Sequence, residues 1–342
     1  MPPLIVIVGE TASGKSALAM ELAEKLGGEL ICADSWTVYR GFDIGTAKPT
    51  AEDQALVPHH LLDVADPSVG FSAAEFQRLA KQAIADIVVR GKLPIMVGGT
   101  GLYIDSVLYD YSFLPASDPT LRDELNAMSL ENLIKKAESM ELDMSGIDLR
   151  NKRRVIRLIE NNGVRPSKKP MRENTLVIGM KRPLEELRER IIARIDTMVE
   201  QGFPDEVRRL GEQYGWDCEP MRAPGYRAFA DYVLGKISLQ EAKDRFRQND
   251  LQLAKKQRTW FRRLGYPNSP AAELPFSASA RPGSKAIQPG IAQSPKQAET
   301  QKSSTPQQLN PDIPAARNSS IQWVSDPSYA VDIATTFLNK KD

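Results

Sequence analysis

The chain has 342 residues, of which 41% are hydrophobic and 26% charged, enough for roughly two globular domains. The longest apolar stretch near its start, Leu4 to Val8, is far shorter than the roughly 20 residues of a bilayer span, and no signal-peptide pattern precedes it. Two cysteines and two histidines are too few for a zinc finger or a disulfide framework. We therefore expect a soluble protein of the reducing cytoplasm, with no membrane partner.

The formal net charge of +1 hides two strongly basic segments. Residues 150–172 hold nine lysines and arginines against one acid, and residues 243–263 hold eight against two. Charges act over about a Debye length, roughly 8 to 10 Å, so these segments matter more than the sum. A polyanionic partner is one interpretation of these segments, and two solvated helix faces are the other.

The chain begins with the pattern of a strand, a loop and a helix. Leu4 to Val8 is a β-branched run that ends on Gly9, and Ala17 to Leu26 places leucines on one helical face. Further strands are predicted at Glu29 to Ala33 and at Pro94 to Val97.

Both of the later strands end in residues that could carry chemistry. Asp34 follows the first of them, and Gly98-Gly99-Thr100-Gly101 follows the second. Between them, Ser72-Ala-Ala-Glu75 predicts the start of a helix that Gly91 closes. Strands that alternate with helices predict an α/β fold, a P-loop doubly wound parallel sheet, whose ligands lie outside the carboxyl ends of the strands.

The rest of the chain is predominantly helical up to Tyr266. From about Ala116 to Lys169 the pattern is wholly helical, with Asp118-Pro119 opening one helix and Arg153 to Glu160 forming another, which predicts an inserted α-helical subdomain. The prolines, serines and glutamines after Tyr266 predict disorder, and hydrophobic residues return only near the end, where a short docked strand or helix is expected. The expected divisions are the first part of the core (1–115), the insert (116–180), a helical return with a basic helix (181–265), a disordered tail (266–318) and a short C-terminal element (319–342).

The segment Gly9-Glu-Thr-Ala-Ser-Gly14-Lys15-Ser16 fits the P-loop pattern G-x-x-x-x-G-K-[ST]. In such a loop, successive backbone N–H groups and a helix N-terminus attract phosphate oxygens. Lys15 adds a point charge, and the hydroxyl of Ser16 can hold Mg²⁺. The motif therefore predicts a ligand with two or more phosphates, and Mg²⁺ with it.

Asp34 allows three interpretations. Spacing alone favours the first, support of Mg²⁺, because a carboxylate at the end of an apolar strand has this role in a P-loop nucleotidase. Asp34 could instead accept a proton from an attacking amine, or cap a turn. Thr100 is a candidate site residue only because its glycine-rich loop is expected at the same sheet edge as Asp34.

Near the end of the helical region, a helix from about Asp250 to Leu264 has two distinct faces. Lys255, Arg258 and Arg262 lie on one face, which suits a phosphate backbone. Leu253, Trp260, Phe261 and Leu264 form its predicted core stripe. His59 and His60 are adjacent, so on a strand they point to opposite sides and are expected to be structural.

Taken together, these motifs resemble tRNA dimethylallyltransferases of the bacterial type, in the same order and over roughly residues 4 to 265. The resemblance is carried by the P-loop, Asp34-Ser35, Val38-Tyr39-Arg40-Gly41, Asp43-Ile-Gly-Thr-Ala-Lys-Pro49, Gly98-Gly-Thr-Gly-Leu-Tyr103, Gly225-Tyr226, Ala254-Lys-Lys-Gln257 and Thr259-Trp-Phe-Arg262. The Asp43 to Pro49 run is the most specific of these.

The resemblance implies the transfer of a dimethylallyl group to N6 of the adenosine on the 3′ side of the anticodon. Asp34 would act as general base, with Thr100 beside the diphosphate. The implied diphosphate-binding residues are Gly9, Thr11, Ala12, Ser13, Gly14, Lys15, Ser16 and Arg222, with Mg²⁺ on Ser16. The implied contacts to the tRNA anticodon stem-loop are Ser35, Trp36, Thr37, Arg122, Arg153, Arg154, Val155, Ile156, Arg157, Gly225, Tyr226, Arg227, Lys255, Lys256, Gln257, Arg258, Thr259, Trp260 and Arg262.

Four positions differ from the family pattern. Glu10 replaces a proline, Thr37 a glutamine, Pro224 an aliphatic residue and Leu251 an arginine. We expect a monomer.

Other functions fit parts of the sequence. A P-loop kinase of a small metabolite that uses ATP and Mg²⁺, prenyl transfer to free AMP, ADP or ATP, and a non-enzymatic RNA-binding module are the alternatives. The free-nucleotide interpretation has little use for the two basic segments, whereas the insert could mimic the arginine-rich lid of a kinase.

Overall fold

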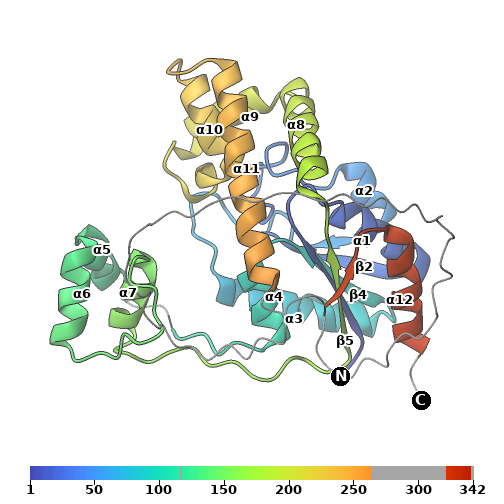
Figure 1. Ribbon diagram of the computed structural model, residues 1–342, viewed down its shortest axis with the longest axis horizontal. Helices are drawn as coiled ribbons and strands as arrows, with labels where there is room; N and C mark the ends of the chain where they lie inside the picture. Colours follow the sequence, from blue (N-terminus) through green and yellow to red (C-terminus); the bar gives the residue numbers. More distant parts are fainter. Residues whose placement is uncertain (116–117, 263–320, 340–342) are drawn as a thin grey trace, which may run out of the picture. The chain divides into compact units, whose positions relative to one another are not determined.

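A computed structural model describes residues 1–115, 118–262 and 321–339 (Figure 1). Its Cα positions divide into two compact units. The described part of the first consists of residues 1–115, 165–262 and 321–339, and that of the second of residues 118–164. The tail expected at 266–318 lies outside the described residues.

The first unit is built on a six-stranded sheet in the order β3-β2-β4-β1-β5-β6, in which every pair is parallel. The strands are β1 (Leu4–Gly9), β2 (Gly28–Ala33), β3 (His59–His60), β4 (Leu93–Gly98), β5 (Thr175–Met180) and β6 (Gln322–Val324). The predicted α/β doubly wound fold is confirmed, because parallel strands need crossover connections and these place helices over both faces.

The two faces of the sheet bury alternate residues of β1. Leu4, Val6 and Val8 pack in one core with α3 (Ala73–Val89) and α4 (Gly101–Leu108). Ile5 and Ile7 pack in the other core, with α1 (Lys15–Leu26) and α12 (Pro327–Asn339). A continuous apolar run is therefore needed at a strand that is covered on both sides.

A third core belongs to the helices that follow β5. These are α8 (Leu184–Glu200), α9 (Phe203–Tyr214), the 3₁₀ helix η1 (Glu219–Arg222), α10 (Pro224–Val233) and α11 (Leu239–Arg262). Their buried side chains, among them Phe203, Tyr226 and Phe246, enclose Tyr39 and Phe42 from the chain after β2. This segment precedes the short helix α2 (Ala51–Leu56).

The second unit contains the helices α5 (Pro119–Ala127), α6 (Leu130–Ser139) and α7 (Lys152–Glu160) around a small core of their own. Asp118 caps the first of them, as predicted. The helix predicted at Arg153 to Glu160 is confirmed as α7, although the helical pattern expected up to Lys169 is not continued beyond it. The last helix ends at Glu160, since Gly163 has a positive φ of 80° and Pro166 and Pro170 lack the N–H that a helix interior requires.

The C-terminal element contains both a strand and a helix. β6 pairs with β5, and α12 packs beside α1 (Figure 1). Among the helices of the described residues, none has both the length and the apolar character needed to cross a bilayer.

Candidate active site

The phosphate-binding loop connects β1 to α1, as predicted. Gly14 adopts a φ of 94° and Ala12 a φ of 61°, both in the left-handed region that turns backbone N–H groups inward. At Gly9 a Cβ atom would lie 2.8 Å from the carbonyl oxygen of Met180, so the close passage of β5 requires glycine. Thus Gly9, Thr11, Ala12, Ser13, Gly14, Lys15 and Ser16 form one compact loop at the carboxyl end of β1.

Lys15 lies in a crowded electrostatic environment. Its Nζ donates to the carbonyl oxygen of Glu10 at 3.2 Å. Burial lowers the pKa of Lys15 to about 8; the charge of Asp34 opposes this shift and the charge of Arg194 adds to it. An anion bound beside the ammonium group would favour its protonated form.

Asp34 and Thr100 lie together at the sheet edge, as their positions after β2 and β4 predicted. The Oγ1 of Thr100 accepts the N–H of Ser35 at 3.0 Å, and the N–H of Thr100 donates to the carbonyl of Ala33 at 3.2 Å. The Oδ1 of Asp34 accepts the N–H of Trp36 at 2.8 Å. This bond fixes the carboxylate in a turn, so the capping interpretation is realised without excluding a chemical role.

A pocket of about 370 Å³ joins Lys15 and Asp34. Its wall also includes the hydroxyl-bearing Ser16 and Thr37. The remaining wall is partly apolar, with Met20, Leu30, Cys32 and Val97. One cavity therefore offers a charged end for an anion and an apolar surface for a hydrocarbon group.

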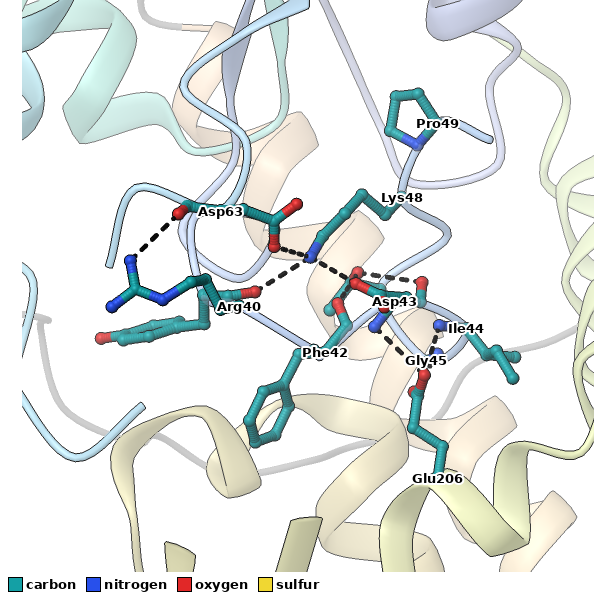
Figure 2. Close-up of polar contacts among 12 residues, drawn as sticks. Arg40, Phe42, Asp43, Ile44, Gly45, Lys48, Pro49, Asp63 and Glu206 are labelled. Carbon is teal, nitrogen blue, oxygen red and sulfur yellow. Dashed lines mark hydrogen bonds and ion pairs between the residues drawn. The ribbon is translucent and has the colours of Figure 1, made fainter. Parts of the chain in front are cut away.

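The Asp43 to Pro49 segment forms another wall of this pocket and is held from two sides (Figure 2). Glu206 of α9 accepts the backbone N–H groups of Asp43 (3.2 Å), Ile44 (2.9 Å) and Gly45 (3.1 Å). Its Oε1 also accepts the hydroxyl of Tyr226 at 2.5 Å. Glu206 is only 7% exposed, and both oxygens of its carboxylate accept hydrogen bonds that fix the loop.

Lys48 holds the same loop from within. Its Nζ donates to the carbonyl of Tyr39 at 2.9 Å and forms ion pairs with Asp43 at 2.5 Å and Asp63 at 2.6 Å. Figure 2 shows this ammonium group between the two carboxylates. The run that carried the resemblance therefore encodes a rigid wall of the pocket.

Helix α11 contacts the phosphate-binding loop through its buried face. Gln257 accepts the N–H of Thr11 at 2.7 Å and donates to the carbonyl of Gly99 at 3.2 Å. Arg258 pairs with the buried carboxylate of Glu10. The charge that Glu10 introduces is therefore neutralised within the protein, and Arg258 does not belong to the exposed face with Lys255.

The predicted tRNA contacts fall into three groups by exposure. Those on the surface are Arg153, Arg154, Arg227, Lys255, Lys256, Thr259 and Arg262. Those half-buried are Ser35, Trp36, Arg122, Arg157, Arg258 and Trp260, and those buried are Thr37, Val155, Ile156, Gly225, Tyr226 and Gln257. Val155, Ile156 and Tyr226 pack in the cores, the side chain of Gln257 bonds to the loops at Thr11 and Gly99, and Thr37 lines the pocket.

Several half-buried positions already have protein partners. Arg122 and Arg157 pair with Glu160, whose side chain is completely buried in the second unit. Trp260 packs against Gly101 and donates to Asp105 at 3.0 Å. Arg222 is exposed at the end of η1 and does not line the 370 Å³ pocket.

Sequence reasoning missed Arg194, Glu206 and Lys48 as parts of the site. Arg194 lines the pocket beside Lys15, although the two residues lie in different segments of the chain. Of these three, only Lys48 could have been found from the sequence, because it lies in the Asp43 to Pro49 segment, whose motif is specific to the family. His59 lines the pocket, whereas His60 bonds to Glu29 at 2.7 Å, so the two rings do point to opposite sides.

The donor set of the pocket suits Mg²⁺ held largely by its ligand. Among the residues that the structure describes, no group of three His, Cys, Asp or Glu side chains could hold a metal ion. Ser16 and Asp34 supply oxygens at the pocket. Mg²⁺ usually binds to few protein oxygens and completes its octahedron with phosphate oxygens and water, which this set permits.

Comparison with known proteins assigns the family. The model of the family described as IPP transferase matches residues 37–264. The chain belongs to the IPP transferase family. A tRNA dimethylallyltransferase of Anoxybacillus flavithermus is 43% identical over 270 residues, which cover 76% of this chain and 87% of that protein.

Solved structures of other IPP transferases support the same fold. The tRNA isopentenylpyrophosphate transferase of Bacillus halodurans is 40% identical, with a TM-score of 0.60 over 78% of this chain and 88% of its own. A eukaryotic dimethylallyltransferase that acts on tRNA is 27% identical, with a TM-score of 0.65 over 76% of this chain and 70% of that one. The predicted family resemblance is confirmed.

Proposed function

We propose that this IPP transferase moves the dimethylallyl group of dimethylallyl diphosphate to N6 of the adenosine on the 3′ side of the tRNA anticodon. The chain is an enzyme, a tRNA dimethylallyltransferase, as its relatives are named. The observation that supports the detailed reaction is the single pocket that unites Lys15, Asp34 and an apolar wall.

The residues divide the reaction between them. An aromatic amine is a weak nucleophile, so the allylic carbon must become strongly electrophilic as diphosphate departs. The electron pair of the breaking C–O bond leaves with the diphosphate, and the backbone N–H groups of the loop and Lys15 would stabilise the negative charge that grows there. As N6 bonds to the carbon, Asp34 would take the proton of the amine. The apolar residues Met20, Leu30 and Val97 would surround the prenyl chain and exclude water.

Ser16 is the proposed ligand of Mg²⁺. The ion, when bound, would supply further neutralisation of the diphosphate. Thr100 would lie beside the reacting groups and keep the Asp34 loop in place through Ser35.

The exposed basic residues of α7, α10 and α11 are the proposed tRNA contacts. Lys255, Lys256 and Arg262 lie on α11 and Arg153 and Arg154 on α7, and all five are exposed. Such side chains suit phosphates, which position an RNA without reading its sequence. We also propose a monomer that acts where tRNA is found, in the cytoplasm.

Labelled substrate tests the proposal directly. The protein is incubated with labelled dimethylallyl diphosphate and, in parallel, with bulk tRNA, AMP or ATP. We expect label only in tRNA, at an adenosine next to the anticodon. Label in AMP or ATP would support the free-nucleotide alternative, and phosphate transfer from ATP to a small metabolite would support the kinase alternative. Family membership favours neither of these two.

A further inference from the structure

Thr37 brings a buried hydroxyl group to the wall of the substrate pocket. It lies in the turn of residues 35–38 that follows Asp34, and both residues line the cavity of about 370 Å³. Its side chain is only 6% exposed, and among the described residues its Oγ1 has no hydrogen-bond partner. A threonine hydroxyl can both donate and accept hydrogen bonds, so this bonding capacity is unused.

The backbone of Thr37 is fixed by the chain that runs beside it. The N–H of Asp63 donates to the carbonyl of Thr37 at 3.3 Å, and the N–H of Ala65 donates to the carbonyl of Val38 at 2.8 Å. The carboxylate of Asp63 is itself paired with Lys48 at 2.6 Å. The wall at Thr37 therefore belongs to the same hydrogen-bonded network as the Asp43 to Pro49 segment, and its hydroxyl group extends from a fixed backbone.

Other polar side chains in this wall already have partners within the protein. The hydroxyl of Thr46 donates to the carbonyl of Phe42 at 2.7 Å. The Nδ1 of His59 lies 2.7 Å from the carbonyl of Val57, to which it must donate because a carbonyl only accepts. Thr37 differs from these two neighbours in that its hydroxyl is unsatisfied.

A purely hydrocarbon donor would leave this hydroxyl without a partner. Water can bond to such a group in an open pocket, but a prenyl chain that fills the pocket expels the water. The two methyl groups at the end of a dimethylallyl chain neither donate nor accept hydrogen bonds. Because a buried hydroxyl without a partner is costly, a donor that carries its own hydroxyl group at this end would bind with that cost removed.

The residue at this position also sets the room in the pocket. Thr37 stands where the family pattern has a glutamine. The side chain of threonine is shorter than that of glutamine, so it leaves space for one more small group close to Asp34. A hydroxymethyl group in place of one methyl group of the donor would use both this space and the unsatisfied hydroxyl.

We propose that this enzyme also accepts a hydroxylated prenyl diphosphate, in which one terminal methyl group of the dimethylallyl chain carries a hydroxyl, and that Thr37 determines this specificity by a hydrogen bond to that hydroxyl. The inference rests on the proposed function and extends its class of donor. In the transfer, the C–O bond to the diphosphate breaks and its electron pair leaves with the diphosphate, N6 bonds to the carbon, and the N6 proton passes to Asp34. The hydroxyl of the donor is retained in the product, so no oxidant is required.

A competition experiment measures this specificity. The protein is incubated with tRNA and an equal mixture of dimethylallyl diphosphate and its hydroxylated analogue. The two modified adenosines, which differ by a single oxygen atom, are quantified by mass spectrometry. At equal concentrations their ratio equals the ratio of the two kcat/KM values, and for wild type we expect amounts within about tenfold of each other.

Thr37→Val removes the hydroxyl and keeps the shape of the side chain. The hydroxyl of the donor then loses its partner, so kcat/KM for the hydroxylated donor should fall about 10- to 100-fold, whereas kcat/KM for dimethylallyl diphosphate should not fall. The thermal midpoint should not fall either, because the hydroxyl that is removed has no partner among the described residues. Thr37→Ser retains the hydroxyl and is the matched control, with the product ratio of wild type. Thr37→Gln fills the space and should exclude the hydroxylated donor.

An unchanged product ratio in Thr37→Val would overturn the proposal, as would a wild-type enzyme that uses only the dimethylallyl donor. A higher KM for tRNA in Thr37→Val, equal with either donor, would also overturn it and make Thr37 a contact to RNA. Transfer of the dimethylallyl group alone would leave the proposed function intact. If wild type transferred neither prenyl group to tRNA, the proposed function itself would fail.

Discussion

Asp34 is the residue whose chemistry is most open to a direct test. Its Oδ1 already accepts the N–H of Trp36, so a replacement must preserve that bond. Asp34→Asn keeps the size and an acceptor oxygen but cannot take a proton. We expect the single-turnover rate to fall about 10²- to 10⁴-fold, with pyrophosphate and tRNA binding retained. A turnover close to that of wild type would remove Asp34 from the role of general base.

Glu10 and Arg258 form a pair that no local pattern could reveal, since 248 positions separate them. The carboxylate is only 4% exposed. Arg258→Ala leaves this carboxylate buried without its partner, and we expect the free energy of unfolding to fall by about 1–3 kcal/mol. The measurement is urea denaturation.

A double-mutant cycle separates this pairing from RNA binding. Glu10→Ala combined with Arg258→Ala should recover part of the lost stability, because no charge remains buried. Lys255→Ala, on the exposed face of the same helix, is the control and should leave the unfolding midpoint in place. Equal losses in Arg258→Ala and in the double variant would contradict the pairing.

At the scale of residues, the sequence predicted best those site residues that directly follow a strand. Lys15 was singled out by the P-loop pattern, and Asp34 and Thr100 were singled out because parallel strands bring their carboxyl ends to one edge. Arg194 and Glu206 come from helices more than 160 positions from the loops that they hold. Helical periodicity says which face is apolar but not which loop the opposite face meets.

At the scale of elements, the Asp43 to Pro49 loop depends on a helix that follows it by more than 150 residues. Glu206 fixes three of its backbone N–H groups and the hydroxyl of Tyr226. In Glu206→Gln, an amide N–H₂ group replaces one carboxylate oxygen and faces N–H or O–H donors, from which it cannot accept a hydrogen bond. We expect about 1–3 kcal/mol less unfolding stability and a higher KM for dimethylallyl diphosphate, because the pocket wall loosens.

The control for this loop lies next to Glu206 in the sequence. Asp205 is exposed and forms an ion pair with Arg208 on the same helix, so Asp205→Asn should change neither stability nor KM. Steady-state kinetics at saturating tRNA and thermal unfolding measure both effects. An unchanged KM in Glu206→Gln would mean that this loop does not shape the substrate pocket.

The sequence predicted some of the helices and strands well and missed others. The strands at 28–33 and 93–98 and the helix capped by Ser72 were predicted nearly to their ends, because alternating or helical patterns and caps marked them. β5 was not predicted, although it lies beside β1 in the centre of the sheet. Its run Leu176-Val-Ile-Gly is short and follows a basic segment, so nothing local distinguished it from a buried piece of helix.

At the scale of the whole molecule, the chain returns to its first sheet at the very end. β6 pairs with β5 after a stretch that the sequence marked only as low in hydrophobic residues. Trp323 packs on Gly179, where a Cβ atom would lie 2.6 Å from the indole. The sequence predicted a docked strand or helix here. It could not predict the pairing with β5, because register between distant strands is fixed by packing rather than by local pattern.

The two basic surfaces, one in each unit, predict how tRNA affinity depends on salt. Lys255 and Lys256 are exposed on α11, and Arg153 and Arg154 on α7. Each cation that neutralises a phosphate releases counterions, so the slope of log K against log salt should fall by about 1 for each such residue removed. The double variants Lys255→Ala/Lys256→Ala and Arg153→Ala/Arg154→Ala should each flatten the slope by up to about 2, and the losses should add in the fourfold variant.

The controls show whether both units contact the RNA. Lys135→Ala removes a cation of the second unit that is paired with Glu131, and it should leave the slope unchanged. Pyrophosphate affinity should stay constant throughout, because none of these residues lines the pocket that contains Lys15. If only the α11 variant flattens the slope, the second unit does not contact tRNA phosphates. Its basic helix would then be a solvated face, as its composition alone also allowed.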